Sequence, residues 1–363
     1  MNYKPENTTI AVIGGGNIGT QFACVCASKG YKVNIYTSRP ELFSRQLEIV
    51  DEYGKITTGI INSVSSDLER TVVGCDVVFV TYPAAFLRDF SRQLIRYVEK
   101  EMVVFMLPGT GGAEFAFREC INKGAILAGV QRVPSVARLE QYGKRVRCEG
   151  VRQELFLASI PSAYSIELSE FISSLWSIPC SPLPNYLNVT LTPSNPILHT
   201  TRLRTLFSDY HEGVIYDRNP LFYGEWSDEA SRLLIACDQE LQCMLKKLDK
   251  FDLHYIRSLK QHYESDTPDL MTRKIRSINS LHNLLSPMKR VENGWVPDFK
   301  SRYFTADFSY GLAIIEEFAR LLNYAAPNID ETMSWYRSVT SDDRRFSFSE
   351  YGIHELEEIY RIY

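Results

Sequence analysis

The sequence contains no uninterrupted apolar run of the roughly 18 residues that a membrane-spanning helix requires. It also has no basic excess, because 40 Lys and Arg stand against 44 Asp and Glu and give a net charge of -4. A nucleic-acid-binding surface usually needs a strongly basic domain, so neither a membrane nor nucleic acid is an expected partner. The first seven residues lack the apolar core of a secretory signal, which favours a cytoplasmic location.

Closely spaced cysteines are scarce as well. Of the eight cysteines, only Cys24 and Cys26 lie close together, on different faces of a predicted helix. Neither a histidine nor a second cysteine pair accompanies them in the sequence. We therefore expect both to be small buried hydrophobic side chains, and we expect no metal site.

The length of 363 residues is large for one compact core, and the sequence pattern changes near residue 180. We therefore predict two domains, at residues 1–180 and 181–363. The segment 178–184 contains three prolines and is the predicted connection between them.

The N-terminal half alternates between predicted strands and helices. Short apolar runs predict strands at 8–14, 31–37, 76–82 and 102–107, and a helix follows the first strand as far as about Lys29. Continuously apolar strands are typical of a parallel sheet that helices cover on both faces. The fold class is therefore α/β, with an N-terminal Rossmann domain built on a doubly wound parallel sheet.

A glycine turn directly follows the first predicted strand. Gly14 would permit a tight bend, Gly16 would let the backbone approach a diphosphate, and Gly19 would let the helix pack close to the sheet. The amides of Asn17 and Ile18 would then lie at the positive end of the helix dipole, facing the phosphates. The position after a strand favours dinucleotide binding over a glycine turn without a ligand.

The end of the second predicted strand bears on the choice of cofactor. An NAD-specific site usually has an acidic residue there, whereas this chain has Ser38 and Arg39. An arginine can bind a 2′-phosphate through two charge-assisted hydrogen bonds, so we predict a preference for NADP(H), with NAD(H) possible. The alternative is that Arg39 is a solvated loop cation. Pro83, at the end of the third predicted strand, should also line the cofactor site.

The C-terminal half is predicted to be an all-α domain. Ser227 is a suitable N-cap, and apolar residues then recur at steps of three and four as far as Leu248. Further helices are predicted from Pro268 and across 310–322. Among the six histidines, His199 stands out because it follows Asn195 and Pro196 at a predicted loop-to-helix junction, where a side chain can face a cleft.

Four motifs, in this order and spacing, resemble the octopine (opine) dehydrogenase family. They are the glycine turn at 14–19, the segment 133–143 with Arg138 and Tyr142-Gly143, the segment 195–199 and the segment 301–312. Members of this family couple an amino acid to an α-keto acid and reduce the resulting imine with NAD(P)H. The resemblance therefore implies an oxidoreductase whose partners are these two small molecules, acting as a monomer or a homodimer.

The resemblance also implies roles for individual residues. His199 matches the catalytic histidine of the family, Asp307 the aspartate that holds and polarises it, and Arg302 the arginine that completes the site. Two alternatives stay open: Asp307 could cap a helix, and Arg302 could be a structural ion-pair partner. The family commonly has Glu-Asp before Val-Pro or Ile-Pro, whereas this chain has Ala306-Asp307-Phe308-Ser309, which leaves the substrate less certain than the chemistry.

Three further residues are candidates for binding the substrate. Gln131 and Arg138 should face the cleft from the first domain, and Asn195 precedes the histidine by one helical turn. An arginine at a strand end often only satisfies loop carbonyls, which is the alternative for Arg138.

Two other functions are alternatives to NADPH-dependent opine synthesis. A keto-acid reductase similar to ketopantoate reductase would need a catalytic lysine early in its helical domain, but residues 186–218 contain no lysine. A protein that binds NADPH without turnover would not need the combination of His199, Arg302 and Asp307.

Overall fold

The structure is a computed structural model that describes residues 3–340 and 344–363. The chain forms two compact units, the first comprising residues up to Thr190 together with 362–363, and the second comprising Leu191–Arg361. The proline-rich segment proposed as the connection is instead part of the first unit, where strand β12 (Cys180–Pro182) pairs with β11 (Leu155–Ile160) at the edge of a sheet. An edge strand tolerates proline because its outer amides need no ladder partner.

The main sheet of the first unit has eight strands in the order β12-β11-β8-β7-β6-β1-β2-β5. Every pairing is parallel except that of β8 with β11. This confirms the predicted doubly wound fold. The strands not yet given bounds are β1 (Thr9–Ile13), β2 (Lys32–Tyr36), β5 (Ser63–Ser65), β6 (Val77–Val80), β7 (Val103–Met106) and β8 (Ile126–Val130).

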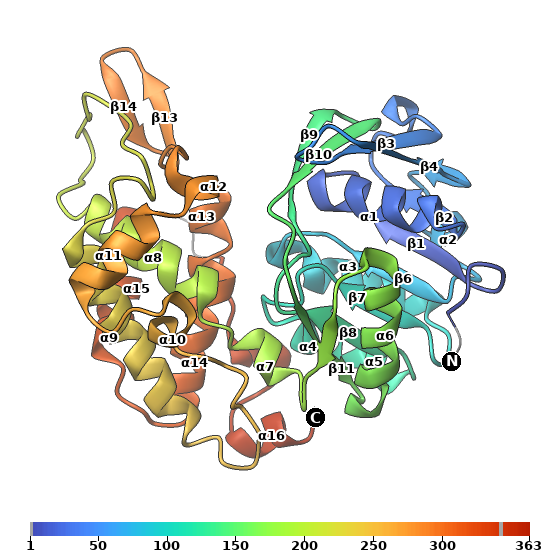
Figure 1. Cartoon of the computed structure of the whole chain (residues 1–363). Helices are drawn as coiled ribbons and strands as arrows, with labels where there is room; N and C mark the ends of the chain where they lie inside the picture. The colour runs from blue at the N-terminus through green and yellow to red at the C-terminus, as the bar shows by residue number, and fades with distance from the viewer. Residues whose placement is uncertain (1–2, 341–343) are drawn as a thin grey trace. The chain divides into compact units, whose positions relative to one another are not determined.

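Strand β1 lies at the point where the sheet changes winding direction. It pairs with β2 on one side and with β6 on the other, so the chain runs outward from it both ways. Ligands of such sheets bind beyond the carboxyl ends of the strands at this switch point. The glycine turn after Ile13 is therefore at the expected place for a ligand (Figure 1).

Helix α1 (Asn17–Ser28) is covered by a second sheet that the sequence did not predict. This sheet has the order β4-β3-β10-β9, formed by β3 (Gln46–Val50), β4 (Ile56–Ile60), β9 (Val136–Gln141) and β10 (Arg145–Glu149) (Figure 1). Its approach to α1 is close, because a Cβ added at Gly59 would lie 2.5 Å from the carbonyl oxygen of Cys24. The small sheet fixes α1 from the side opposite the main sheet.

Among the other helices of the first unit, α6 (Ser165–Trp176) has 12 residues, as many as α1. The shorter ones are α2 (Leu68–Val72), α3 (Leu87–Leu94), α4 (Ala113–Ala116), α5 (Arg118–Asn122) and α7 (Leu187–Thr190).

Within its described residues, the second unit is helical, as predicted, apart from a hairpin of β13 (Met288–Val291) and β14 (Gly294–Pro297). Ser227 caps α9, its hydroxyl accepting from the amide of Ala230 at 3.2 Å. Buried aromatic rings fill its core; Phe304, Phe308 and Tyr336 form one stack. The helices are α8 (Ser194–Leu206), α9 (Asp228–Leu245), α10 (Leu259–Tyr263), α11 (Pro268–Arg276), α12 (Asn279–His282), α13 (Arg302–Thr305), α14 (Ala313–Leu321), α15 (Pro327–Val339) and α16 (Leu356–Tyr360).

The helix predicted across 310–322 begins with a π-helical turn at Phe308–Leu312, and α14 continues it. The wider turn packs tightly against the start of α8, because a Cβ added at Gly311 would lie 3.0 Å from the ring of Pro196. Isolated π turns often occur at functional sites, and this one directly follows Asp307.

Among residues 3–340 and 344–363, no helix is both long and apolar enough to cross a bilayer. The same residues contain no group of three or more His, Cys, Asp or Glu side chains arranged to hold a metal ion.

A buried carboxyl group in the first unit should make stability depend on pH. Glu114 is fully buried, and its Oε1 accepts from the hydroxyls of Thr190 at 2.5 Å and Tyr363 at 2.7 Å. Burial raises the pKa of Glu114 to about 7, so between pH 4.5 and 7 the folded state holds a proton that the unfolded state releases. Stability should therefore fall as pH rises through this window, by on the order of 2–3 kcal/mol.

The Glu114→Gln variant should remove most of this pH dependence, which thermal unfolding between pH 5 and 8 would measure. Glu119→Gln is the matched control, because Glu119 lies on the exposed side of the next helix. Equal pH dependence of the wild type and Glu114→Gln would contradict the assignment.

Candidate functional site

The three glycines of the turn at 14–19 have distinct surroundings. Gly14 has a φ of +108°, which side-chain-bearing residues rarely adopt, so the tight bend after β1 favours glycine there. A Cβ at Gly19 would lie 1.8 Å from the carbonyl oxygen of Gly14, so only glycine lets α1 approach the strand this closely. A Cβ at Gly16 would meet no described atom within 4 Å.

This arrangement fits the diphosphate of a dinucleotide. Gly16 is the N-cap of α1, and within the described chain no side chain caps this helix end. The first amides of α1, including those of Asn17 and Ile18, therefore remain available to an anion at the positive end of the helix dipole. The open space beside Gly16 is where the backbone could approach such a group.

The Asn17 side chain has a structural task. Its Oδ1 accepts from the backbone amide of Leu139 in β9 at 2.9 Å and so ties the start of α1 to the small sheet. Asn17 would therefore contact a ligand through its backbone amide, the same group predicted for it and for Ile18.

Arg39 is exposed after β2, and its guanidinium lies over the ring of Tyr142 at 4.2 Å from the ring centroid. The hydroxyl of Tyr142 in turn lies 3.1 Å from that of Thr37. A guanidinium stacked on an aromatic face keeps its N–H edge free for a phosphate. Tyr142 belongs to the turn between β9 and β10, so the unpredicted sheet supplies the support for Arg39; Ser38, beside it, is exposed.

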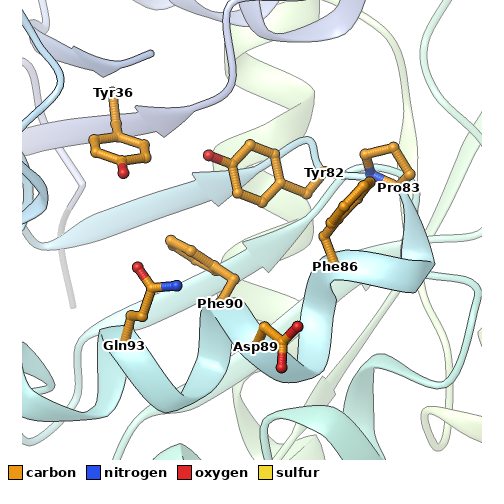
Figure 2. A pocket seen from close by; sticks show the side chains of 7 residues that line it. All are labelled: Tyr36, Tyr82, Pro83, Phe86, Asp89, Phe90 and Gln93. Carbon is orange, nitrogen blue, oxygen red and sulfur yellow. The ribbon is translucent and has the colours of Figure 1, made fainter. Parts of the chain in front are cut away.

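A pocket of about 390 Å³ lies beyond the ends of β2 and β6. Figure 2 shows Tyr36 at the end of β2, Tyr82 and Pro83 on the loop after β6, and Phe90 on α3. Phe86, Asp89 and Gln93 complete the lining. Aromatic faces with two polar groups suit a flat heterocycle. The pocket also includes Pro83, which was predicted to line the cofactor site.

Two predicted substrate ligands of the first unit donate hydrogen bonds to backbone carbonyls. Gln131 donates from Nε2 to the carbonyl of Asn188 at 2.7 Å. Arg138 is exposed on β9 and donates from Nη1 to the carbonyl of Ala137 at 3.1 Å. This bond is of the kind expected if Arg138 satisfies a backbone carbonyl, which was the alternative to substrate binding.

In the second unit, the structure brings His199 and Asp307 together. His199 lies on α8, one turn inside the helix rather than at the predicted junction, and it is 8% exposed. Its Nδ1 is 2.7 Å from Oδ2 of Asp307. Asp307 immediately precedes the π turn, and its side chain caps no helix among the described residues. The aspartate thus orients the imidazole instead of serving as the N-cap that was the alternative.

Sequence reasoning missed the partner of the other ring nitrogen. The hydroxyl of Tyr223 lies 2.8 Å from Nε2 of His199, and Tyr223 is 5% exposed. The ring of Tyr303 packs 4.5 Å from the imidazole, between centroids. Tyr303 lies in the motif at 301–312, and Tyr223 lies in the aromatic-rich segment 221–226. Aromatic residues alone are more often core than site.

The structure does not bring Arg302 and Asn195 to the imidazole. Arg302 is exposed at the start of α13, and its side chain has no ion pair or hydrogen bond with another described residue. Asn195 is exposed in the first turn of α8, on the same face as His199 because the two are one turn apart.

Two families match different parts of the chain. Residues 182–340 match "NAD/NADP octopine/nopaline dehydrogenase, alpha-helical domain". Residues 9–114 match "NAD-dependent glycerol-3-phosphate dehydrogenase N-terminus".

Individual relatives extend over nearly the whole chain. The opine dehydrogenase of Haliotis discus hannai is 25% identical over 91% of this chain and 89% of its own length. A solved octopine dehydrogenase with NADH and L-arginine has a TM-score of 0.85 at 21% identity, covering 97% of both chains. A yersinopine dehydrogenase with NADP⁺ has a TM-score of 0.69 at 13% identity and covers 98% of both chains.

Proposed function

We propose that this chain, an NAD(P)-dependent oxidoreductase of the opine dehydrogenase family that acts on CH–NH donors, condenses an amino acid with an α-keto acid. The imine formed would be reduced to a secondary amine dicarboxylate. The observation that carries the proposal is the His199–Asp307 pair, an oriented acid–base group in the helical unit.

The proposed chemistry needs two proton transfers that His199 is suited to make. The amine must lose a proton before it attacks the keto carbon, and the carbinolamine must gain one on oxygen before water leaves. Because an ionised Asp307 only accepts hydrogen bonds, Nδ1 carries the proton in neutral His199, and Nε2 is the atom that gains and returns one. Asp307 stabilises the imidazolium formed in between.

The bound cofactor would supply the hydride that reduces the imine. The glycine turn and the amides at the start of α1 would hold its diphosphate, and the aromatic pocket with Pro83 would take its flat heterocycle. The exposed guanidinium of Arg302 would bind a substrate carboxylate through two parallel hydrogen bonds. Gln131, Arg138 and Asn195 remain candidate substrate ligands, Arg138 through the N–H groups that Ala137 does not use.

We further propose that NADP(H) is preferred. Solved relatives hold NADH in one case and NADP⁺ in another, so the relatives leave the choice to this chain's own residues. The preference for NADP(H) is supported by the guanidinium of Arg39, which stacks on Tyr142 with its N–H edge exposed. A guanidinium group held in this way can bind a phosphate with little further loss of side-chain entropy.

The Arg39→Asp variant should weaken NADPH binding by roughly 10- to 100-fold while changing NADH binding little, because only NADPH carries the 2′-phosphate. Titration of both reduced cofactors by fluorescence would measure the two affinities. Arg45→Asp is the matched control, since it makes the same charge change at an exposed residue of the same unit. Equal loss of both cofactors in Arg39→Asp would refute the preference.

The reaction itself is tested by following the absorbance of NADPH or NADH with each amino acid plus pyruvate, α-ketoglutarate or glyoxylate. Oxidation that requires both the amine and the keto acid would support the proposal. Oxidation with the keto acid alone would instead indicate a keto-acid reductase. Bound cofactor without oxidation in any mixture would favour a binding protein.

A further inference from the structure

Both ring nitrogens of His199 are engaged by buried or partly buried side chains. Nδ1 faces Asp307 at 2.7 Å, and Nε2 faces the hydroxyl of Tyr223 at 2.8 Å. With Nδ1–H donating to the carboxylate, neutral Nε2 accepts from the phenol. A proton that enters or leaves the imidazole at Nε2 therefore meets the oxygen of Tyr223 first.

The position of Tyr223 is fixed from two sides. Arg202, one turn beyond His199 on α8 and 3% exposed, donates from Nε to the carbonyl of Phe222 at 3.1 Å and from Nη2 to that of Glu225 at 2.8 Å. The carboxylate of Glu225 is itself held by Arg218 at 2.5 and 2.9 Å. Helix α8 thus carries both His199 and Arg202, and Arg202 holds the segment that places the Tyr223 hydroxyl against the imidazole.

The phenol also has an outward neighbour. Tyr223 hydrogen-bonds the side chain of Tyr303, which is partly exposed. Burial raises the pKa of Tyr223 well above its ordinary value, and the nearby groups Tyr303, Tyr263 and Asp307 raise it further. The hydroxyl can therefore pass a proton on only by gaining another at the same time, since its phenolate would not accumulate.

We propose that Tyr223 is the proton relay between Nε2 of His199 and the reacting amine and carbinolamine, an inference that rests on the proposed reductive condensation. In amine activation, the phenol oxygen takes the amine proton as its own proton moves to Nε2. In dehydration, the imidazolium returns a proton to the phenol oxygen while the phenol proton moves to the leaving hydroxyl. Each step moves two protons and leaves Tyr223 neutral.

The Tyr223→Phe variant tests the relay. We expect kcat to fall by about 10- to 100-fold, with KM and cofactor affinity little changed, because the ring still packs while the hydroxyl is gone. Tyr216→Phe is the matched control, since the Tyr216 hydroxyl is buried without a hydrogen-bond partner in the described chain. A Tyr223→Phe variant as fast as the wild type, or faster, would show that the phenol merely covers Nε2 and would overturn the relay.

A proton inventory in mixed H₂O and D₂O separates a relay from a purely structural role. If two protons move together, the wild-type rate should curve with the deuterium fraction, whereas the slow residual rate of Tyr223→Phe should be linear. A linear dependence in the wild type, under conditions where proton transfer limits the rate, would contradict the relay.

Nitrogen NMR of His199 tests the contact without cofactor or substrate. The Nε2 resonance should move toward that of a free, unprotonated nitrogen in Tyr223→Phe and should stay in place in Tyr216→Phe. A resonance that does not respond overturns the relay whatever the reaction is. Failure of the proposed function would be seen separately, as cofactor oxidation by the wild type that does not require an amine. In that case, comparing Tyr223→Phe with the wild type in the amine-independent reaction still tests whether Tyr223 relays protons.

Discussion

Replacing His199 with alanine is expected to lower turnover at least about 100-fold while leaving the affinity for the reduced cofactor unchanged. The imidazole is the acid–base group of the proposed reaction, and its Nδ1 lies 2.7 Å from Asp307. The glycine turn belongs to the other compact unit, so cofactor affinity should not depend on the histidine. Steady-state rates with saturating amine and keto acid, together with a cofactor titration, would measure both quantities.

Two further variants test whether the loss of activity in His199→Ala comes only from a damaged fold. His199→Gln keeps a hydrogen-bonding side chain in the buried site but cannot titrate, so it should lose turnover with less damage to thermal stability. His211→Ala removes an exposed histidine whose Nδ1 lies 3.1 Å from the backbone carbonyl of its neighbour Glu212, and it should behave as the wild type. Near-normal turnover in His199→Ala would refute the assigned role.

The α/β fold could be predicted because the central strands consist of short, continuously apolar segments. Strands β6 and β7 are buried along their whole length, so their residues form continuous apolar runs. The second sheet escaped prediction for the opposite reason. Its strand β4 is mostly exposed and β9 alternates irregularly, so neither gives the apolar run or the regular period that marks a strand.

The candidate site shows the same division. His199 and Asp307 were predicted as partners although they are 108 positions apart, but only because the family resemblance paired them. Tyr223 and Tyr142 were not given roles, because spacing cannot reveal that one phenol meets an imidazole and the other a guanidinium. Such contacts depend on backbone turns held by other residues, as Arg202 holds the segment around Tyr223.

The Gly16→Ala variant should fold as stably as the wild type yet bind the cofactor at least about tenfold more weakly, a loss of about 1.4 kcal/mol or more. Its backbone angles (φ -81°, ψ -165°) suit alanine, and the added methyl group would meet no described atom within 4 Å. The protein itself therefore gives no reason for glycine at this position. A diphosphate held against the backbone at the start of α1 does give one, because the methyl group would occupy its place.

Gly19→Ala provides the contrast, because its methyl group would collide with the carbonyl oxygen of Gly14. That variant should lose thermal stability as well as cofactor affinity, since α1 must move away from β1. Calorimetric titration with NADPH and thermal unfolding without it would separate the two cases. If Gly16→Ala binds NADPH as tightly as the wild type, the open space beside Gly16 does not hold the diphosphate, and the cofactor must approach the sheet elsewhere.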